Sequence, residues 1–305
     1  MERIDRLLML DPEIICHQIE TFLRRKLHEL GRQGILVGIS GGLDSAIAAT
    51  LSVRAIGRDQ VRLRYLPDRD SKSLHRQHAQ LLAQKLGVVL EIQDITPILE
   101  AMGVYQMLPI DAIPGKILRE MAVRLGASLL ELRTGSSILE TRFHPEPESL
   151  AAKAVTYGLT KHRLRMLLLY QQAEIHQLMV VGAVNRTEWM TGTFSLWGVD
   201  HCADVMPLVH LYRSQLYPLA AFLKLPKAIV KKNADPDFLP GLDNKEALLG
   251  SFLEADRILI GLERGIARKD LIESYGEETV NRIERLIILS KTMRETPYGI
   301  EMQDS

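Results

Sequence analysis

The chain has 305 residues, and its 38 lysines and arginines balance its 38 aspartates and glutamates, so the formal net charge is zero. This balance argues against a general nucleic-acid binder, which needs a basic surface. No stretch approaches the roughly 18 consecutive apolar residues of a membrane-spanning helix, and residues 1–11 lack a signal-peptide core. The two cysteines, Cys16 and Cys202, form neither a disulfide framework nor a Cys-x-x-Cys metal site. We therefore expect a cytoplasmic enzyme that binds neither nucleic acid nor membrane.

The first part of the chain alternates between strand and helix patterns. Asp11 suits a helix N-cap and Pro12 the first helical position, and apolar residues then recur at helical spacing up to Gly31. Three short apolar runs are predicted strands: 35–39, 61–67 and 88–92. Helical patterns separate these runs, with the second helix predicted at 71–86. This alternation is typical of a parallel sheet with right-handed crossovers.

The middle of the chain, at about 100–160, is less regular, and we interpret it as an atypical insertion. Helices are predicted at 116–125 and 128–132. Glycine, serine and proline residues predict a loop at 134–149, and residues 130–150 either close over the substrate or form a surface loop without a role in catalysis.

Regular patterns return at Lys161. The sequence predicts a strand at 179–183, a loop-to-helix junction at 185–190 and a fifth strand at 203–208. The remaining predictions are helices, at 161–177, 211–223, 244–263 and 277–293. The fold class is therefore α/β, with a doubly wound parallel sheet of about five strands and helices on both faces. We predict one domain over residues 1–305, with a helical C-terminal part at 244–305.

The most informative stretch joins the first strand to the next helix. Ser40, Gly41 and Gly42 form a loop of small residues whose backbone N–H groups can point at one anion. The helix behind the loop adds partial positive charge. A carboxylate beside an anion is unfavourable unless a cation lies between them, so Asp44 is a predicted Mg²⁺ ligand. The stretch is neither a Walker loop nor a dinucleotide fingerprint.

The segment from Ser40 to Ser45, Ser-Gly-Gly-Leu-Asp-Ser, resembles the pyrophosphate loop of the N-type ATP pyrophosphatases. That resemblance implies a set of ATP-binding residues: Gly38, Ile39, Ser40, Gly41, Gly42, Leu43, Asp44 and Ser45.

Later motifs resemble one branch of that superfamily, the ammonia-dependent NAD synthetases. Arg163-Leu-Arg-Met is similar to the family's Arg-x-Arg-Met helix, which implies that Arg163 binds the dinucleotide substrate. The segment 182–188 is similar to Gly-Thr-x-Asn-x-Ser-Glu, which implies that Glu188 shares Mg²⁺ with Asp44. Ala183 replaces the family's threonine, so one hydroxyl contact to ATP is missing or moved.

Two further motifs complete the resemblance. The segment 192–204 resembles the stretch that ends in a substrate-binding aspartate, here Asp204, but Leu196 replaces a substrate-contacting lysine. The segment 211–215 resembles Leu-Tyr-Lys-Thr-Gln, so Arg213 is implied to neutralise ATP phosphate. Met293 stands where many members of the family have a lysine. These departures leave the acid substrate open.

The resemblance implies an ATP-dependent amide ligase. It would convert nicotinic acid adenine dinucleotide and ammonia to NAD through an acyl-adenylate, releasing AMP and pyrophosphate. It implies ATP and Mg²⁺ as cofactors and no covalent nucleophile, with Asp44 and Arg213 acting electrostatically. His201 beside Cys202 invites a nucleophilic interpretation, but activation by ATP makes a nucleophile unnecessary.

The resemblance also implies a homodimer, for which helices 11–30 and 161–177 offer surface. We expect no glutaminase domain, because residues 1–34 are too few, so ammonia is free or comes from a separate glutaminase. Three alternatives remain: a related pyrophosphatase amidating another carboxylate, a tRNA-modifying member of the superfamily, and a non-enzymatic nucleotide-binding regulator.

Overall fold

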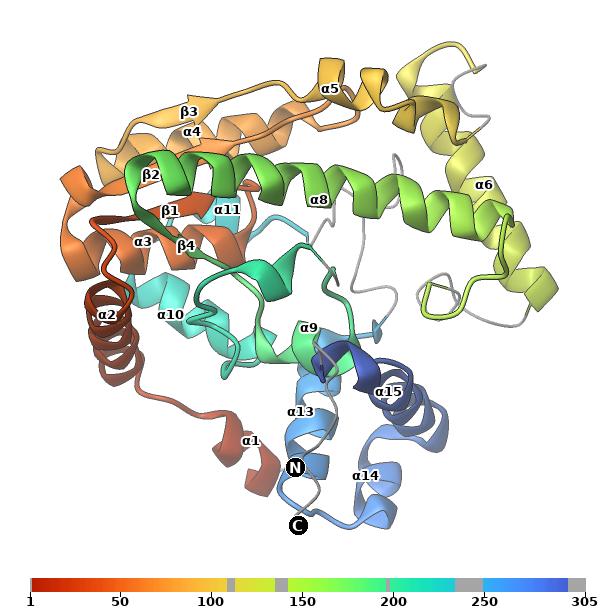
Figure 1. Ribbon diagram of the computed structural model, residues 1–305. Coiled ribbons are helices and arrows are strands. Elements are labelled where there is room, and N and C mark those ends of the chain that lie inside the picture. Colours follow the sequence, from red (N-terminus) through yellow and green to blue (C-terminus); the bar gives the residue numbers. More distant parts are fainter. Residues whose placement is uncertain (1, 109–112, 135–141, 196–197, 234–248, 296–305) are drawn as a thin grey trace, which may run out of the picture.

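The computed structural model describes residues 2–108, 113–134, 142–195, 198–233 and 249–295 (Figure 1). Its centre is a parallel sheet of four strands in the order β3-β2-β1-β4. The strands are β1 Gly34–Gly38, β2 Val61–Tyr65, β3 Leu90–Ile92 and β4 Leu178–Val181. Central β1 pairs with β2 on one side and β4 on the other, with Ile35 opposite both Val61 and Met179. The predicted α/β class with a parallel sheet is confirmed.

Helices surround this sheet. Their bounds are α1 Glu2–Leu8, α2 Pro12–Glu29, α3 Leu43–Ile56, α4 Ser73–Leu86, α5 Thr96–Ala101, α6 Lys116–Thr134, α8 Leu150–His176, α9 Arg186–Thr191, α10 Leu216–Phe222, α11 Lys227–Val230, α13 Phe252–Glu263, α14 Arg268–Tyr275 and α15 Glu277–Leu289. The predicted cap of α2 forms, because the Asp11 carboxylate accepts the N–H of Glu13 at 2.9 Å. Among the described helices, none combines the length and the apolar character that crossing a membrane requires.

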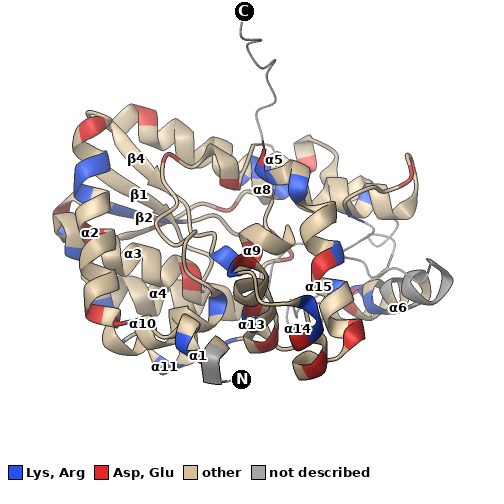
Figure 2. Ribbon diagram, turned by 90° about the horizontal axis from the view of Figure 1, so that it is seen from below, with Lys and Arg blue, Asp and Glu red and all other residues tan. Residues whose placement is uncertain are grey.

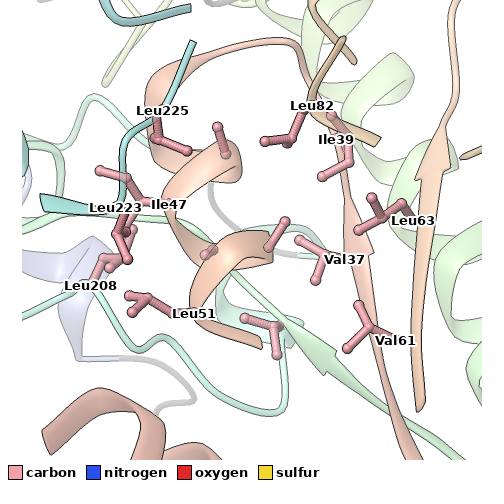
Figure 3. Packing of buried hydrophobic residues seen from close by; sticks show 14 of the residues in the cluster. Val37, Ile39, Ile47, Leu51, Val61, Leu63, Leu82, Leu208, Leu223 and Leu225 are labelled. Carbon is pink, nitrogen blue, oxygen red and sulfur yellow. The ribbon is translucent and has the colours of Figure 1, made fainter. Parts of the chain in front are cut away.

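Alternation along β1 sends its side chains to two different cores. Ile35 and Val37 pack with α2, α3, α4 and α10 on one face, whereas Leu36 packs with α5 and α8 on the other. Figure 3 shows the first of these cores, in which Ile47 and Leu51 of α3 lie beside Leu223 and Leu208, and Val37 lies on the other side of the helix. Both faces of β1 are covered, which explains why the strand is apolar at every position from 35 to 37.

The C-terminal helices form a separate hydrophobic cluster. Residues of α13, α14 and α15 pack together there, and Ile4 of α1 joins them from the other end of the chain. Figure 1 shows α1 beside α13, below the sheet in that view. Figure 2 shows acidic and basic positions interspersed along the helices, as the zero net charge leads one to expect.

The predicted fifth strand is wrong for the described residues. Segment 203–208 makes one parallel bridge, between Val205 and Val181, and then leaves the sheet. The side chain of Asp204 accepts the N–H of Val180 at 2.7 Å, which occupies a donor that a fifth strand needs. Pro207 has no N–H to continue the pairing. The sheet therefore ends at β4.

Several helix boundaries also differ from prediction. The two helices expected at 116–132 are one helix, α6, and α8 begins at Leu150 because Ser149 caps it, accepting the N–H of Ala152 at 3.1 Å. Helix α14 was not predicted. Residues 135–141, at the centre of the expected closing segment, and 234–248, where the expected 244–263 helix begins, lie outside the described residues.

Candidate functional site

The predicted glycine loop, residues 39–42, connects the C-terminal end of β1 to α3. Gly41 has φ +71°, a conformation that glycine adopts without strain. A Cβ atom on Gly41 would lie 2.4 Å from the carbonyl oxygen of His75, so only glycine fits between the loop and α4. Because the loop follows the C-terminal end of β1, it lies at the edge of the sheet where ligands bind in open α/β folds.

Two serines hold the loop in shape. The Ser45 hydroxyl lies 3.1 Å from the Ser40 hydroxyl, and it donates to the carbonyl oxygen of Gly42 at 3.2 Å. The Ser40 hydroxyl also accepts the N–H of Gly42 at 3.3 Å. Gly42 is the N-cap of α3 and, as a glycine, makes no side-chain capping hydrogen bond. The α3 N-terminus therefore lies beside two hydroxyls that can turn toward an anion.

Asp44 meets two residues from distant parts of the chain. One carboxylate oxygen accepts a hydrogen bond from the Asn185 amide at 2.8 Å, and the other pairs with the Arg213 guanidinium. Asn185 follows β4 and caps α9, accepting the N–H of Glu188 at 3.0 Å. The structure therefore brings together three predicted site residues, Asp44, Glu188 and Arg213, around one asparagine.

Arg213 is the cation of this site and is only 4% exposed. Burial opposes its charge, but Asp44, Tyr217 and Glu188 together outweigh burial and raise the pKa of Arg213 above its usual value. Among the described residues its Nε atom is buried without a hydrogen-bond partner. A buried guanidinium with a donor to spare suits a phosphate oxygen.

The donor set of the site fits Mg²⁺ in its usual nucleotide-bound form. In the described part of the chain, no three His, Cys, Asp or Glu side chains are placed to hold a metal by themselves. Mg²⁺, however, usually takes one or two carboxylates and completes its shell with water and substrate phosphate. Asp44 and Glu188 both lie near Arg213 and can supply those carboxylates. Their shared binding of Mg²⁺ stays a prediction.

Three residues of the predicted ATP-binding set serve the fold. Ile39 and Leu43 are buried in the core, and the Ile39 N–H donates to the Arg64 carbonyl at 2.7 Å. Gly38 ends β1, and a Cβ atom there would come within 3.0 Å of the Leu169 side chain. These residues position the loop, in which Gly41 is buried, Gly42 is half-buried and Ser40 is exposed.

The predicted substrate residues lie on or beside α8. Arg163 lies against Gly198, whose Cβ would be 3.4 Å from the arginine Cγ. The Asp204 carboxylate makes hydrogen bonds within the protein. It accepts the Val180 N–H at 2.7 Å and the Tyr170 hydroxyl at 2.8 Å. Its contact with substrate stays a prediction. His201 packs against the rings of Trp189 and Phe194, at centroid distances of 5.0 and 5.1 Å.

A buried ionic cluster lies in the segment that follows β2. Lys161 of α8 is fully buried, and its Nζ atom lies 2.8 Å from Asp68 and 3.2 Å from Asp70. Arg165 donates to the Leu66 carbonyl at 3.0 Å. Because both carboxylates lie within reach of the ammonium, the cluster fixes the segment after β2 against α8.

The sequence is similar to known proteins over nearly its whole length. A family model for NAD synthase matches residues 15–110 and 122–297. The chain belongs to the NAD synthase family. It is 36% identical over 275 residues to the NH₃-dependent NAD⁺ synthetase of Thermotoga maritima, covering 90% of this chain and 94% of that protein. With the enzyme of that name from Coprothermobacter proteolyticus, identity is 31% over 286 residues, covering 93% and 96%.

Solved structures agree with the fold of this NAD synthase family member. The NMN synthetase of Francisella tularensis has a TM-score of 0.70 at 22% identity, covering 96% of this chain and all of that one. The NH₃-dependent NAD synthetase of Campylobacter jejuni has a TM-score of 0.68 at 22% identity, with the same coverage. The predicted family is confirmed by the family model and by the relatives at 36% and 31% identity.

Two residues of this NAD synthase site were not singled out from the sequence. Asn185, which bonds to Asp44, lies in a recognised motif and precedes a helix, so its capping role was a readable signal. Lys232 donates to the Gly41 carbonyl at 3.4 Å and brings a second cation to the glycine loop. Its segment resembled a family motif only loosely, and the contact depends on tertiary structure.

Proposed function

We propose that this chain forms NAD from nicotinic acid adenine dinucleotide and ammonia, with cleavage of ATP to AMP and pyrophosphate. The observation that carries the proposal is the convergence of the glycine loop, Asp44, Glu188 and Arg213 at one sheet edge. Relatives that match nearly the whole chain, and are matched over nearly their whole length, are named NH₃-dependent NAD⁺ synthetases. The enzyme class is thus a ligase that forms a C–N bond.

The chain's own groups suit the first half of this reaction. A carboxylate oxygen of the acid attacks the α-phosphorus of ATP, and the bond from that phosphorus to the bridging oxygen breaks. Pyrophosphate leaves with the electron pair, toward the N-terminus of α3, the hydroxyls of Ser40 and Ser45 and the Arg213 guanidinium. Asp44 and Glu188 would hold Mg²⁺, which when bound neutralises phosphate charge.

The second half needs positioning more than acid–base chemistry. Ammonia attacks the acyl carbon, the C–O bond to AMP breaks, and one proton is released. Water competes for the same acyl carbon, so the site must keep the adenylate shielded. Arg163 is the proposed contact for the dinucleotide, because its planar guanidinium can pair with two phosphate oxygens.

Release of pyrophosphate tests this proposal. Purified protein is incubated with ATP, Mg²⁺ and ammonia, with and without nicotinic acid adenine dinucleotide, and NAD and pyrophosphate are measured together. Equal amounts of both products, formed only with the acid, support the proposal. Pyrophosphate with a different acid would indicate the alternative ligase. Tight ATP binding without any pyrophosphate would indicate the regulator.

The partners of the reaction include a second copy of the chain. We infer a homodimer because α6 carries an apolar stripe, with Ile117 at 73%, Met121 at 60% and Leu125 at 64% exposure. These residues recur every four positions, so they share one helix face. The helices first expected to form the interface expose fewer such residues, among them Leu167 of α8 at 66%.

Sedimentation at micromolar concentration tests the dimer, which Met121→Glu should dissociate while Leu167→Glu, on α8, should not. A monomeric wild-type protein would refute it. Free ammonia, or ammonia from a separate glutaminase, is the proposed nitrogen source, and ammonium dependence of the rate tests it. A cytoplasmic location stays a prediction.

A further inference from the structure

The C-terminal helix α13 carries a carboxylate that lies beneath the site. Asp256 has no exposed surface. One of its oxygens accepts the N–H of Ser214 at 2.7 Å, and the other accepts the Thr187 hydroxyl. Ser214 directly follows Arg213, and Thr187 directly precedes Glu188. A single buried side chain thus bonds to the immediate neighbours of two site residues.

A third hydrogen bond closes the network. The backbone N–H of Arg213 donates to the Thr187 hydroxyl oxygen at 2.8 Å. Thr187 is itself fully buried, so its hydroxyl both accepts from Arg213 and donates to Asp256. We call these four residues, Thr187, Arg213, Ser214 and Asp256, the Asp256 network. The network fixes the backbone from which the Arg213 side chain reaches Asp44.

An ionised carboxylate at this depth is unfavourable unless donors compensate for lost water. Burial raises the pKa of Asp256, and the hydrogen bonds from Thr187 and Ser214 oppose that rise. A leucine or alanine on this apolar helix face would pack without such a requirement. The position of an aspartate here therefore indicates a need for directed hydrogen bonds, beyond the filling of space.

The same helix offers a matched comparison two turns later. Glu263 lies seven residues after Asp256, so both project from one face of α13. Glu263 pairs with Arg186 and accepts the Tyr212 hydroxyl, and thus joins the same two segments. Its side chain is 26% exposed, and its partner Arg186 lies one residue further from Glu188 than Thr187 does, whereas Tyr212 directly precedes Arg213. A substitution of Glu263 therefore tests whether any hydrogen-bonded link from α13 to these two segments is enough to position Arg213 and Glu188.

We propose that Asp256 is a positioning residue that sets the orientation of Arg213 and Glu188 toward the nucleotide phosphates. The inference rests on the proposed function in so far as the nucleotide is ATP. A group that acts only by holding others in place can still control the rate, because a displacement of about 1 Å can cost as much as 100-fold.

The test measures MgATP affinity by calorimetry on folded protein, with the urea midpoint recorded for each variant. Asp256→Asn keeps the shape but places an amide N–H₂ against a donor, and Thr187→Val removes the hydroxyl alone. We expect both variants to bind MgATP at least about 10-fold more weakly and to lose kcat as well. Thr187→Ser should restore affinity to within about twofold, and Glu263→Gln should stay within that range.

Wild-type affinity in folded Asp256→Asn or Thr187→Val would overturn the inference. So would an equal loss in Glu263→Gln, because the effect would then belong to α13 as a whole. If Asp256→Asn does not fold, the valine and serine variants of Thr187 still decide the question. Because the readout is ATP binding, wild-type protein that binds MgATP but makes no NAD would refute the proposed function and leave this inference standing.

Discussion

The substitution Gly41→Ala tests whether the close contact between the glycine loop and α4 requires a glycine. Alanine at φ +71° pays about 1–2 kcal/mol for the left-handed conformation. Its Cβ would also lie 2.4 Å from the His75 carbonyl oxygen and 2.9 Å from the His75 Cα, both backbone atoms that cannot rotate away. Forcing an extra methyl into such a space costs about 1–3 kcal/mol more. We therefore expect the free energy of unfolding to fall by about 2–5 kcal/mol.

Gly31→Ala is the matched control. Gly31 has φ +62°, but its added Cβ would meet nothing within 4 Å. It should lose only the conformational part, about 1–2 kcal/mol, in urea denaturation followed by circular dichroism. MgATP affinity should fall in Gly41→Ala, since the loop must move to relieve the contact, and stay unchanged in Gly31→Ala. Equal losses of stability in the two variants, or unchanged affinity in Gly41→Ala, would refute the reasoning.

Three further outcomes follow from the site. Asp44→Asn and Glu188→Gln should each lower turnover at limiting Mg²⁺ by about 100-fold or more, and near wild-type rates in both would exclude the shared metal. Lys232→Met should weaken MgATP binding several-fold, whereas Lys231→Met, on its exposed neighbour, should not. Burial lowers the pKa of His78 below its usual 6.5, so its contribution to stability is present above about pH 6.5 and lost as pH falls. Unfolding free energies measured between about pH 8 and pH 5 should show a shallower decline in His78→Gln than in wild type.

The sheet was predictable where local pattern and tertiary environment agree. β1 is covered on both faces, so its residues form a continuous apolar run that is legible in the sequence. The segment 203–208 is also largely apolar, yet it leaves the sheet because the Asp204 side chain occupies a backbone donor of β4. That hydrogen bond joins residues 24 apart and has no local signature. The unbroken α6 was missed because Gly126, which normally weakens a helix, is tolerated within it.

The site was predictable as motifs but not as an arrangement. Ser40 to Ser45 could be assigned from a loop of small residues between strand and helix, a pattern with a direct physical meaning. The pairing of Asp44 with Arg213 spans 169 residues and appears only once the fold brings two strand ends together. Lys161 lies in a helix whose sequence fits a solvated basic face, and its complete burial against Asp68 depends on β2.

The contact between α1 and α13 has a consequence for biosynthesis. Asp5 of α1 pairs with Arg257 of α13 at 2.7 Å, and Ile4 enters the cluster of the C-terminal helices. During translation, α1 leaves the ribosome long before α13, so it must wait until α13 has been made before its partner exists. The sheet core, built from residues 16–230, can form earlier. An unfinished chain can thus hold a folded sheet yet lack Asp256, and a change within α1 acts on residues that dock only after α13 has formed.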